Sequence, residues 1–347
     1  MRSKIINFIK AHGYLRIIAW MFYNIIPGMI IYCKIIKKYG KNIKIYIEHY
    51  PGTGDVYLTC GFLESLVKRE GYKDNYVLTV IGVGGVKMAQ LFGIEKIEKL
   101  TQHQSNALIH FARLNGFSKL NIEVLHYHPM AMHNGIMDNL MSYNEINFLQ
   151  MYLYCVFPGQ RLGDFQYPTI DDAKIYVDNI FEINGLSGKK VILLCPSANT
   201  IDPLSWNFWC VLAEILEENG YKVCTNAADK EPVIPGTTRI FLQYKYMIEF
   251  TNRCDFCIGL RSGLFDFIAM TKSKLIVLYP KTNSFKFGVG SLYDYFSLNK
   301  MGLTENATEI EFYRDDELNV LKQIIRKYIN IKTNINKIHE MYNYNWR

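Results

Sequence analysis

The feature that most constrains the fold is an alternation of short apolar segments with amphipathic segments, which occurs twice along the chain. In the first half, residues 43–49, 76–81 and 122–127 predict strands, and residues 56–68 carry apolar side chains at helical spacing. Strands separated by helical stretches are typical of parallel βαβ units, in which helices cover both faces of a sheet. The first half therefore predicts a parallel α/β domain.

The same alternation restarts in the second half of the chain. Residues 191–195 predict a strand and residues 206–218 predict a helix. Further strands are expected at 221–225, 239–242, 256–259 and 275–279, with a helix at 263–270 before the last of them. Two successive α/β halves predict two Rossmann-like domains facing a cleft, and in such sheets ligands bind outside the carboxyl ends of the strands.

The looser stretch at residues 158–168 is poor in apolar side chains and predicts the interdomain region. We expect an acceptor-side domain over residues 41–175 and a donor-binding domain over residues 176–310. A C-terminal helix near residues 316–329 and a tail would occupy the rest of residues 311–347. A chain of 347 residues is long enough for two cores of this size.

The net charge of +7 is concentrated at the N-terminus. No acidic residue precedes Glu48, whereas nine lysines and arginines do, and the remaining chain holds 30 basic and 32 acidic residues. A basic surface spread over a folded domain is therefore absent, which argues against nucleic acid as a partner. Residues 1–40 predict a basic, amphipathic helical extension.

This extension has three possible roles. Residues 14–33 are about long enough to span a bilayer, but Arg16, Asn24 and Pro27 interrupt them. Apolar and aromatic side chains with basic flanks favour a helix lying on an anionic membrane surface. The remaining alternative is a helix packed on the first domain.

The turn after the first predicted strand has the sequence Gly52-Thr53-Gly54-Asp55. Glycines let a ligand approach the backbone closely, and a helix start favours negative charge. Asp55 is either the N-cap of the following helix or a general base that deprotonates an acceptor hydroxyl. We expect Gly52, Thr53 and Gly54 on the acceptor side, together with His128, which follows another strand.

Two turns in the second half indicate a donor site. Ser197, Asn199 and Thr200 follow the strand at 191–195, and their hydroxyl and amide groups can bind a diphosphate or a sugar. A later strand ends in a turn whose helix start would bind phosphate, with an arginine as a charged partner. The residues of this second turn are Arg261, Ser262, Gly263, Leu264 and Asp266.

Other motifs predict no cofactor and no metal site. Gly82-Val-Gly-Gly85 has Lys87 where a dinucleotide fingerprint requires glycine, so we expect these glycines to build a tight turn. Cys254-Asp-Phe-Cys257 is a single pair without a second one at zinc-site spacing. The absence of disulfide-framework spacing among the eight cysteines predicts the cytoplasm.

The order of these motifs resembles the ADP-heptose:lipopolysaccharide heptosyltransferase family. The matching segments are Gly52 to Asp55, Pro196-Ser197, Phe208-Trp209 through Leu212-Ala213, and Ser262-Gly263-Leu264, within residues 43–280. The resemblance implies a GT-B fold, an inverting and metal-independent reaction, Asp55 as the base, and the donor diphosphate at Ser262 and Gly263. The chain departs from the family pattern at Arg261, where an aspartate is usual, and at Phe267, where no histidine is found.

We therefore predict a glycosyltransferase at the inner face of the cell membrane. Its partners would be a nucleotide-sugar donor, as a co-substrate, and a glycan or lipid-linked acceptor in the synthesis of a cell-surface polysaccharide. The alternatives are an inactive membrane-attached binding protein of the same fold, a sugar-nucleotide epimerase, and a pyruvyl transferase.

Overall fold

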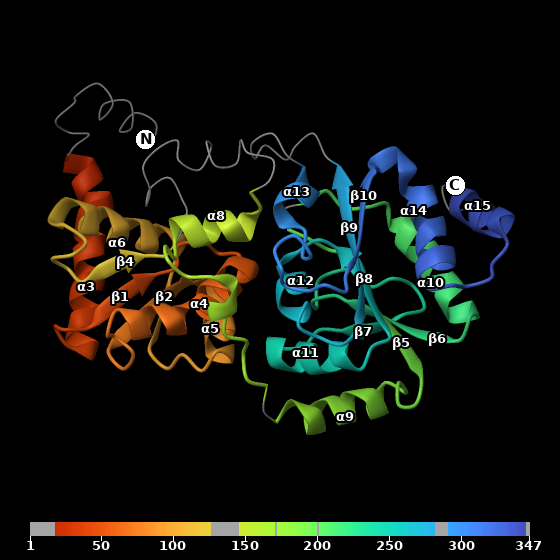
Figure 1. The fold of residues 1–347 in the computed structure, drawn as a ribbon, viewed down its shortest axis with the longest axis horizontal. Coiled ribbons are helices and arrows are strands. Elements are labelled where there is room, and N and C mark those ends of the chain that lie inside the picture. The colour runs from red at the N-terminus through yellow and green to blue at the C-terminus, as the bar shows by residue number, and fades with distance from the viewer. Residues whose placement is uncertain (1–17, 126–145, 171, 200, 282–290, 345–347) are drawn as a thin grey trace, which may run out of the picture. The chain divides into compact units, whose positions relative to one another are not determined.

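The chain forms two compact units, each built around its own parallel sheet (Figure 1). The first unit comprises Met1–Met137 and Tyr152–Pro168, and the second comprises Asp138–Met151 and Thr169–Arg347. A computed structural model describes residues 18–125, 146–170, 172–199, 201–281 and 291–344. The prediction of two parallel α/β domains is confirmed.

The first unit contains a four-stranded parallel sheet in the order β3-β2-β1-β4. Its strands are β1 (Lys44–Ile47), β2 (Tyr76–Ile81), β3 (Ile97–Leu100) and β4 (Ile122–Val124). Its helices are η1 (Met21–Ile25), α3 (Ile26–Tyr39), α4 (Thr53–Arg69), α5 (Gly82–Leu91), α6 (Gln102–Asn115) and the short η2 (Leu162–Asp164), and α8 (Phe148–Cys155) crosses the boundary between the units.

One face of this sheet packs against α3 and α6, which lie side by side (Figure 1). Ile45 and Ile47 of β1 join Ile35 of α3 and Leu108 of α6 in a single buried cluster. The other face packs against α4 and α5. A Cβ atom added at Gly85 of α5 would contact Val80 of β2 at 3.1 Å and Val56 of α4 at 3.7 Å. Both faces are therefore covered, as the apolar strands predict.

Of the glycines predicted to build the turn after β2, only Gly82 does so, and Gly84 and Gly85 lie inside helix α5. Gly82 has a φ of +71°, a conformation that side chains other than glycine rarely adopt. This single residue turns the chain from β2 directly into α5, which begins at Gly82 rather than at the predicted residue 86.

The second unit contains a six-stranded parallel sheet in the order β10-β9-β8-β5-β6-β7. Its strands are β5 (Lys190–Cys195), β6 (Tyr221–Asn226), β7 (Thr238–Ile240), β8 (Phe256–Leu260), β9 (Lys274–Lys281) and β10 (Thr308–Tyr313). Its helices are α9 (Ala173–Ile183), α10 (Trp206–Glu218), α11 (Tyr244–Asn252), α12 (Gly263–Ile268), α13 (Leu292–Phe296), η3 (Arg314–Asp316), α14 (Glu317–Gln323), η4 (Ile324–Tyr328) and α15 (Ile335–Tyr344).

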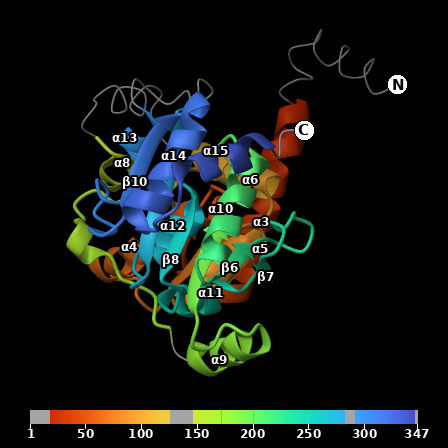
Figure 2. The same ribbon diagram turned by 90° about the vertical axis from the view of Figure 1, so that its right-hand side faces the viewer.

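Helix α10 is fixed from both sides. Phe208 and Trp209 are buried in the core, as their helical spacing predicts. On its outer side, α14 and α15 lie beside it in both views (Figures 1 and 2). Ser205, the N-cap of α10, donates to the buried carboxylate of Glu317 at 2.5 Å. The C-terminal segment is therefore part of the second unit.

The domain boundaries in the structure differ from those that the sequence predicts. Strand β10 crosses the predicted boundary at residue 310, and α9 crosses the one at residue 175. The helix predicted near 316–329 is divided into η3, α14 and η4. Helix α3 belongs to the core of the first unit, so a separate extension ending at residue 40 is wrong for residues 26–39. The physical reason is the apolar face of α3, which the cluster around Ile35 buries.

Candidate active site

The first sheet has one point at which its strand order reverses. The chain runs from β1 to β2 and β3 on one side and returns to β4 on the other. The reversal lies between the carboxyl ends of β1 and β4, where the N–H of Leu125 donates to the carbonyl of Ile47 at 2.8 Å. Ligands of open α/β sheets bind outside the carboxyl ends of the strands at such a point. The predicted acceptor-side turn follows β1 and lies at this end of the sheet.

Asp55 lies in the first turn of α4, and the N-cap of that helix is Gly52. The interpretation of Asp55 as the N-cap is therefore wrong, because two helical residues, Thr53 and Gly54, precede it. A Cβ atom added at Gly52 would lie 2.6 Å from Oδ2 of Asp55, so the carboxylate is folded against the glycine backbone. The helix dipole favours this negative charge in the first turn.

The ring of Tyr50 also lies close to Gly52. The same added Cβ atom would be 2.9 Å from Cδ1 of the Tyr50 ring. Burial raises the pKa of Tyr50, and the negative charge of Asp55 raises it further. Tyr50 and Asp55 therefore flank one glycine, and any larger residue at position 52 would displace one of them. Asp55 itself is partly exposed, which a general base that meets an acceptor requires.

Glu48 is the first residue after β1, and its side chain is fully buried. Its carboxylate accepts hydrogen bonds from the N–H of Tyr50 at 2.9 Å, from the hydroxyl of Tyr152 at 3.2 Å, and from the hydroxyl of Thr59. Burial raises the pKa of Glu48 to about 7, although these hydrogen bonds act in the opposite direction. A carboxyl group that titrates near neutrality at a strand end is typical of functional sites.

His49 is buried beside Glu48 and joins the turn to α6. Its Nδ1 lies 2.8 Å from the hydroxyl of Ser105, and its Nε2 lies 3.1 Å from the amide nitrogen of Gln102. The sequence predicts that Glu48 and His49 lie at the end of a strand, and it predicts no functional role for either residue. The available signal was an acidic residue that directly follows an apolar strand, where burial is costly and a function is therefore plausible.

The second sheet reverses its strand order between β5 and β8. Cys195 of β5 pairs with Gly259 of β8, and a Cβ atom added at Gly259 would lie 2.6 Å from the Cβ of Cys195. This strand order is that of a classic dinucleotide-binding sheet, which binds its ligand at the reversal. The two predicted donor turns follow these two adjacent strands, so the fold brings them to the same edge.

The residues of the two turns differ in accessibility. Ser197 and Asn199 are exposed, and Ser262, Gly263 and Leu264 are partly exposed. All five can therefore meet a ligand at the edge of the second sheet. Two further predicted site residues, Thr200 and His128, lie outside the described residues.

Arg261 and Asp266 are buried and form an ion pair, with 2.5 Å between the guanidinium and the carboxylate. The guanidinium also donates to the carbonyl of Ser262 at 2.6 Å and to the carbonyl of Phe296 at 2.8 Å. Both side chains are thus engaged with the protein itself. This arrangement favours a role in holding the turn over the direct contact with donor phosphate that the sequence predicts for them.

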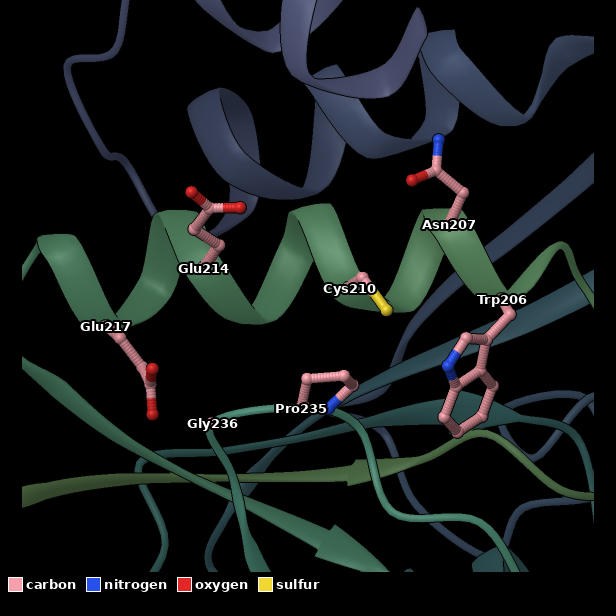
Figure 3. A pocket seen from close by; sticks show the side chains of 7 residues that line it. All are labelled: Trp206, Asn207, Cys210, Glu214, Glu217, Pro235 and Gly236. Carbon is pink, nitrogen blue, oxygen red and sulfur yellow. The ribbon is translucent and has the colours of Figure 1, made fainter. Parts of the chain in front are cut away.

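A hollow of about 650 Å³ lies elsewhere in the second unit, between α10 and the loop that contains Pro235 and Gly236 (Figure 3). Trp206, Cys210 and Glu217 point from α10 toward this loop. None of the predicted site residues lines the hollow. Within the part of the chain that the structure describes, no group of three or more His, Cys, Asp or Glu side chains is arranged to hold a metal ion.

The chain resembles known proteins in its fold and not in its sequence. No protein-family model and no curated protein matches the sequence. Among solved structures, ADP-heptose lipopolysaccharide heptosyltransferase II of E. coli superposes with a TM-score of 0.54 at 13% identity, over 88% of this chain and 100% of that chain. The chain has a GT-B fold.

A second solved structure agrees with the first. A glycosyl transferase of family 9 from Veillonella parvula DSM 2008 superposes with a TM-score of 0.50 at 16% identity, over 88% of this chain and 97% of that chain. The resemblance to heptosyltransferases that the motifs indicate is therefore confirmed at the level of the fold.

Proposed function

We propose that the protein is a glycosyltransferase that transfers a sugar from a nucleotide-sugar donor to a hydroxyl of a glycan or lipid-linked acceptor. The observation that carries this proposal is the position of Asp55, a partly exposed residue, at the strand reversal of a GT-B fold. The proteins that share this fold include an ADP-heptose heptosyltransferase, which supports a nucleotide sugar as the donor.

The proposed reaction is an inverting displacement at the anomeric carbon of the donor. The acceptor oxygen forms a bond to this carbon while Asp55 accepts the hydroxyl proton. The bond between the anomeric carbon and the phosphate oxygen breaks, and the nucleoside diphosphate leaves with the electron pair. Ser262 and Gly263 would bind the departing diphosphate through hydroxyl and N–H groups. We expect turnover to persist when divalent cations are chelated.

The first experiment identifies the donor and then removes the base. A thermal-shift screen over nucleotide sugars reports the donor, because a ligand that binds the folded state raises its melting temperature. With that donor, Asp55→Asn should reduce turnover at least ~100-fold, the scale of a lost general base, and leave donor binding unchanged. Asp74→Asn is the matched control, because Asp74 is exposed and precedes β2, at the opposite end of the strands.

Two outcomes would contradict the proposal. Turnover of Asp55→Asn within a few-fold of the wild type would exclude Asp55 as the base. Epimerisation of the free donor without transfer to any acceptor would show that the protein is an epimerase and not a glycosyltransferase.

We also propose that the enzyme lies on the cytoplasmic, anionic face of the cell membrane. The helical stretch Ile18–Tyr39 is long and apolar enough to cross a membrane. Only 22% of its most apolar window is buried, so the protein itself leaves most of this window uncovered. Its second half packs into the first unit through Gly28 and Ile35, which favours a helix lying on the surface over one that spans the bilayer. All eight cysteines are free, which supports a reducing compartment.

The apolar side chains that would enter the membrane are exposed in the first part of this stretch. Ile18, Phe22 and Met29 are 47%, 66% and 44% exposed. Exposed lysines at positions 34 and 37 continue the same helix and would contact anionic headgroups. Trp20 and Tyr23 also contact His110 and His103 of α6, so this stretch is held on the protein while it keeps exposed apolar surface for lipid.

Vesicle sedimentation tests this surface. The double variant Phe22→Ser with Met29→Ser should no longer sediment with vesicles of phosphatidylcholine and phosphatidylserine, whereas the wild type should sediment and release only partly in high salt. Ile175→Ser with Ile183→Ser is the control, because it removes from α9 two apolar side chains that are even more exposed than Phe22 and Met29. Failure of the wild type to sediment, or equal behaviour of the two double variants, would refute the proposal. Deleting residues 1–38, which the sequence would suggest, is unsuitable because it removes α3 from the core.

A further inference from the structure

The carboxyl group of Glu48 is too deeply buried to meet a substrate, yet it lies at the strand reversal beside the proposed base. Its hydrogen-bond partners come from three separate pieces of the chain: the turn at Tyr50, helix α4 at Thr59, and helix α8 at Tyr152. One buried side chain therefore joins three elements directly after β1.

Two of these bonds bracket Asp55 along the chain. Thr59 lies four residues after Asp55 in α4, so the two side chains share one face of the helix, one turn apart. Tyr50 lies before Asp55, and its ring and the Asp55 carboxylate both pack against Gly52. Movement of either bonded segment would therefore move the carboxylate of Asp55.

We propose that Glu48 is a positioning residue that fixes the carboxylate of Asp55 through its hydrogen bonds to Tyr50 and Thr59. This inference rests on the proposed role of Asp55 as the base. The positioning form is the carboxylate, because an ionised Glu48 accepts from all three donors, whereas a protonated Glu48 must donate one of its own bonds. The hydroxyls of Thr59 and Tyr152 also contact each other, so the loss of one bond perturbs the others.

The ionisation of Glu48 should therefore appear in the pH dependence of turnover. The groups that face Glu48 are the hydroxyls of Thr59 and Tyr152, the buried thiol of Cys60, and the neighbouring Tyr50 and His49. Burial raises the pKa of Cys60 well above its usual value, and the Glu48 charge adds to this, so the thiol stays neutral. Glu48 forms no ion pair with any of the described residues, and burial raises its pKa to about 7.

The test compares Glu48→Gln, Glu48→Ala and Thr59→Val with the wild type. The wild-type kcat should rise as the pH increases through 7. Glu48→Gln should lack this limb between pH 6 and 8 and keep the low kcat of the protonated enzyme, because glutamine has the shape of glutamic acid but does not titrate, and its amide nitrogen can only donate. Glu48→Ala and Thr59→Val should lower kcat about tenfold or more and leave the KM for the donor unchanged. A Glu48→Gln profile with the wild-type limb would overturn the inference.

Hydrogen–deuterium exchange provides a readout that does not depend on activity. At pH 8, exchange of residues 48–56 should accelerate in Glu48→Ala and, to a smaller extent, in Glu48→Gln, whose amide nitrogen cannot accept a hydrogen bond. If these amides are equally protected in Glu48→Ala, Glu48 does not hold the turn, and the inference is wrong. If the wild type transfers no sugar while the exchange result holds, the proposed function fails and the positioning of the turn by Glu48 stands.

Discussion

Substitution of Gly28 by alanine should destabilise the first unit by about 2 kcal/mol. Gly28 lies inside a continuous helical stretch, where alanine alone would be favoured by roughly 1 kcal/mol. The new Cβ atom, however, would lie 2.6 Å from the carbonyl carbon of Ala107 and 2.7 Å from the Cβ of Phe111, and closer still to the Ala107 carbonyl oxygen. Ordinary contact begins at about 3.4 Å, so α3 and α6 must separate by roughly 1.3 Å to relieve the contact with the Ala107 oxygen. Overpacking against a backbone that cannot rotate away costs about 3 kcal/mol, the upper part of the usual range.

The measurement is denaturant unfolding together with hydrogen–deuterium exchange of α3 and α6. Gly163→Ala is the control, because no heavy atom lies within 4 Å of a Cβ atom at that position. Protection should fall in α3 and α6 of the Gly28 variant and remain unchanged in the second unit. If Gly28→Ala is as stable as the wild type or more stable, α3 does not pack on α6 at backbone distance, and the assignment of α3 to the core is refuted.

Two further predictions concern buried charges. Arg261→Ala should destabilise the second unit by about 3–5 kcal/mol because it leaves the carboxylate of Asp266 buried without its partner, whereas Arg261→Met with Asp266→Leu should recover most of that loss in a urea melt. Equal stability of the single and double variants would show that the pair is not coupled. The pKa of Glu48 is raised in the folded state, so the stability of the first unit should fall as the pH rises from about 4.5 to about 7, by roughly 3 kcal/mol in total. Glu48→Gln should remove this decrease, and an unchanged pH dependence would contradict the burial of an ionisable group there.

The sequence alone determined most of the strands and the turns that follow them. Apolar runs such as residues 191–195 are buried on both faces, so their pattern is continuous and local. The glycine-containing turn before Asp55 is also a local signal, because Gly52 must leave room for that carboxylate. The edge strands β3 and β10 are not predicted from the sequence, because β3 has only four residues and both strands mix polar with apolar side chains.

Tertiary structure decided which strands lie side by side, and hence where the candidate sites are. The reversals between β1 and β4 and between β5 and β8 join segments far apart in sequence, and no local pattern encodes that pairing. The partner of α3 is likewise decided by tertiary structure. Its apolar face is compatible with lipid or with protein, and in the structure it packs against α6.

The roles of the charged residues depend most strongly on this long-range packing. The position of Arg261 in a strand-to-helix turn predicts that it binds the donor phosphate. In the structure its guanidinium instead donates to the carbonyl of Phe296, 35 residues away. Glu48 carried no motif, and it became a candidate because Thr59 and Tyr152, 11 and 104 residues away, enclose it. Burial and hydrogen bonding set the protonation and reach of a side chain, and both are properties of the packed neighbours rather than of the residue itself.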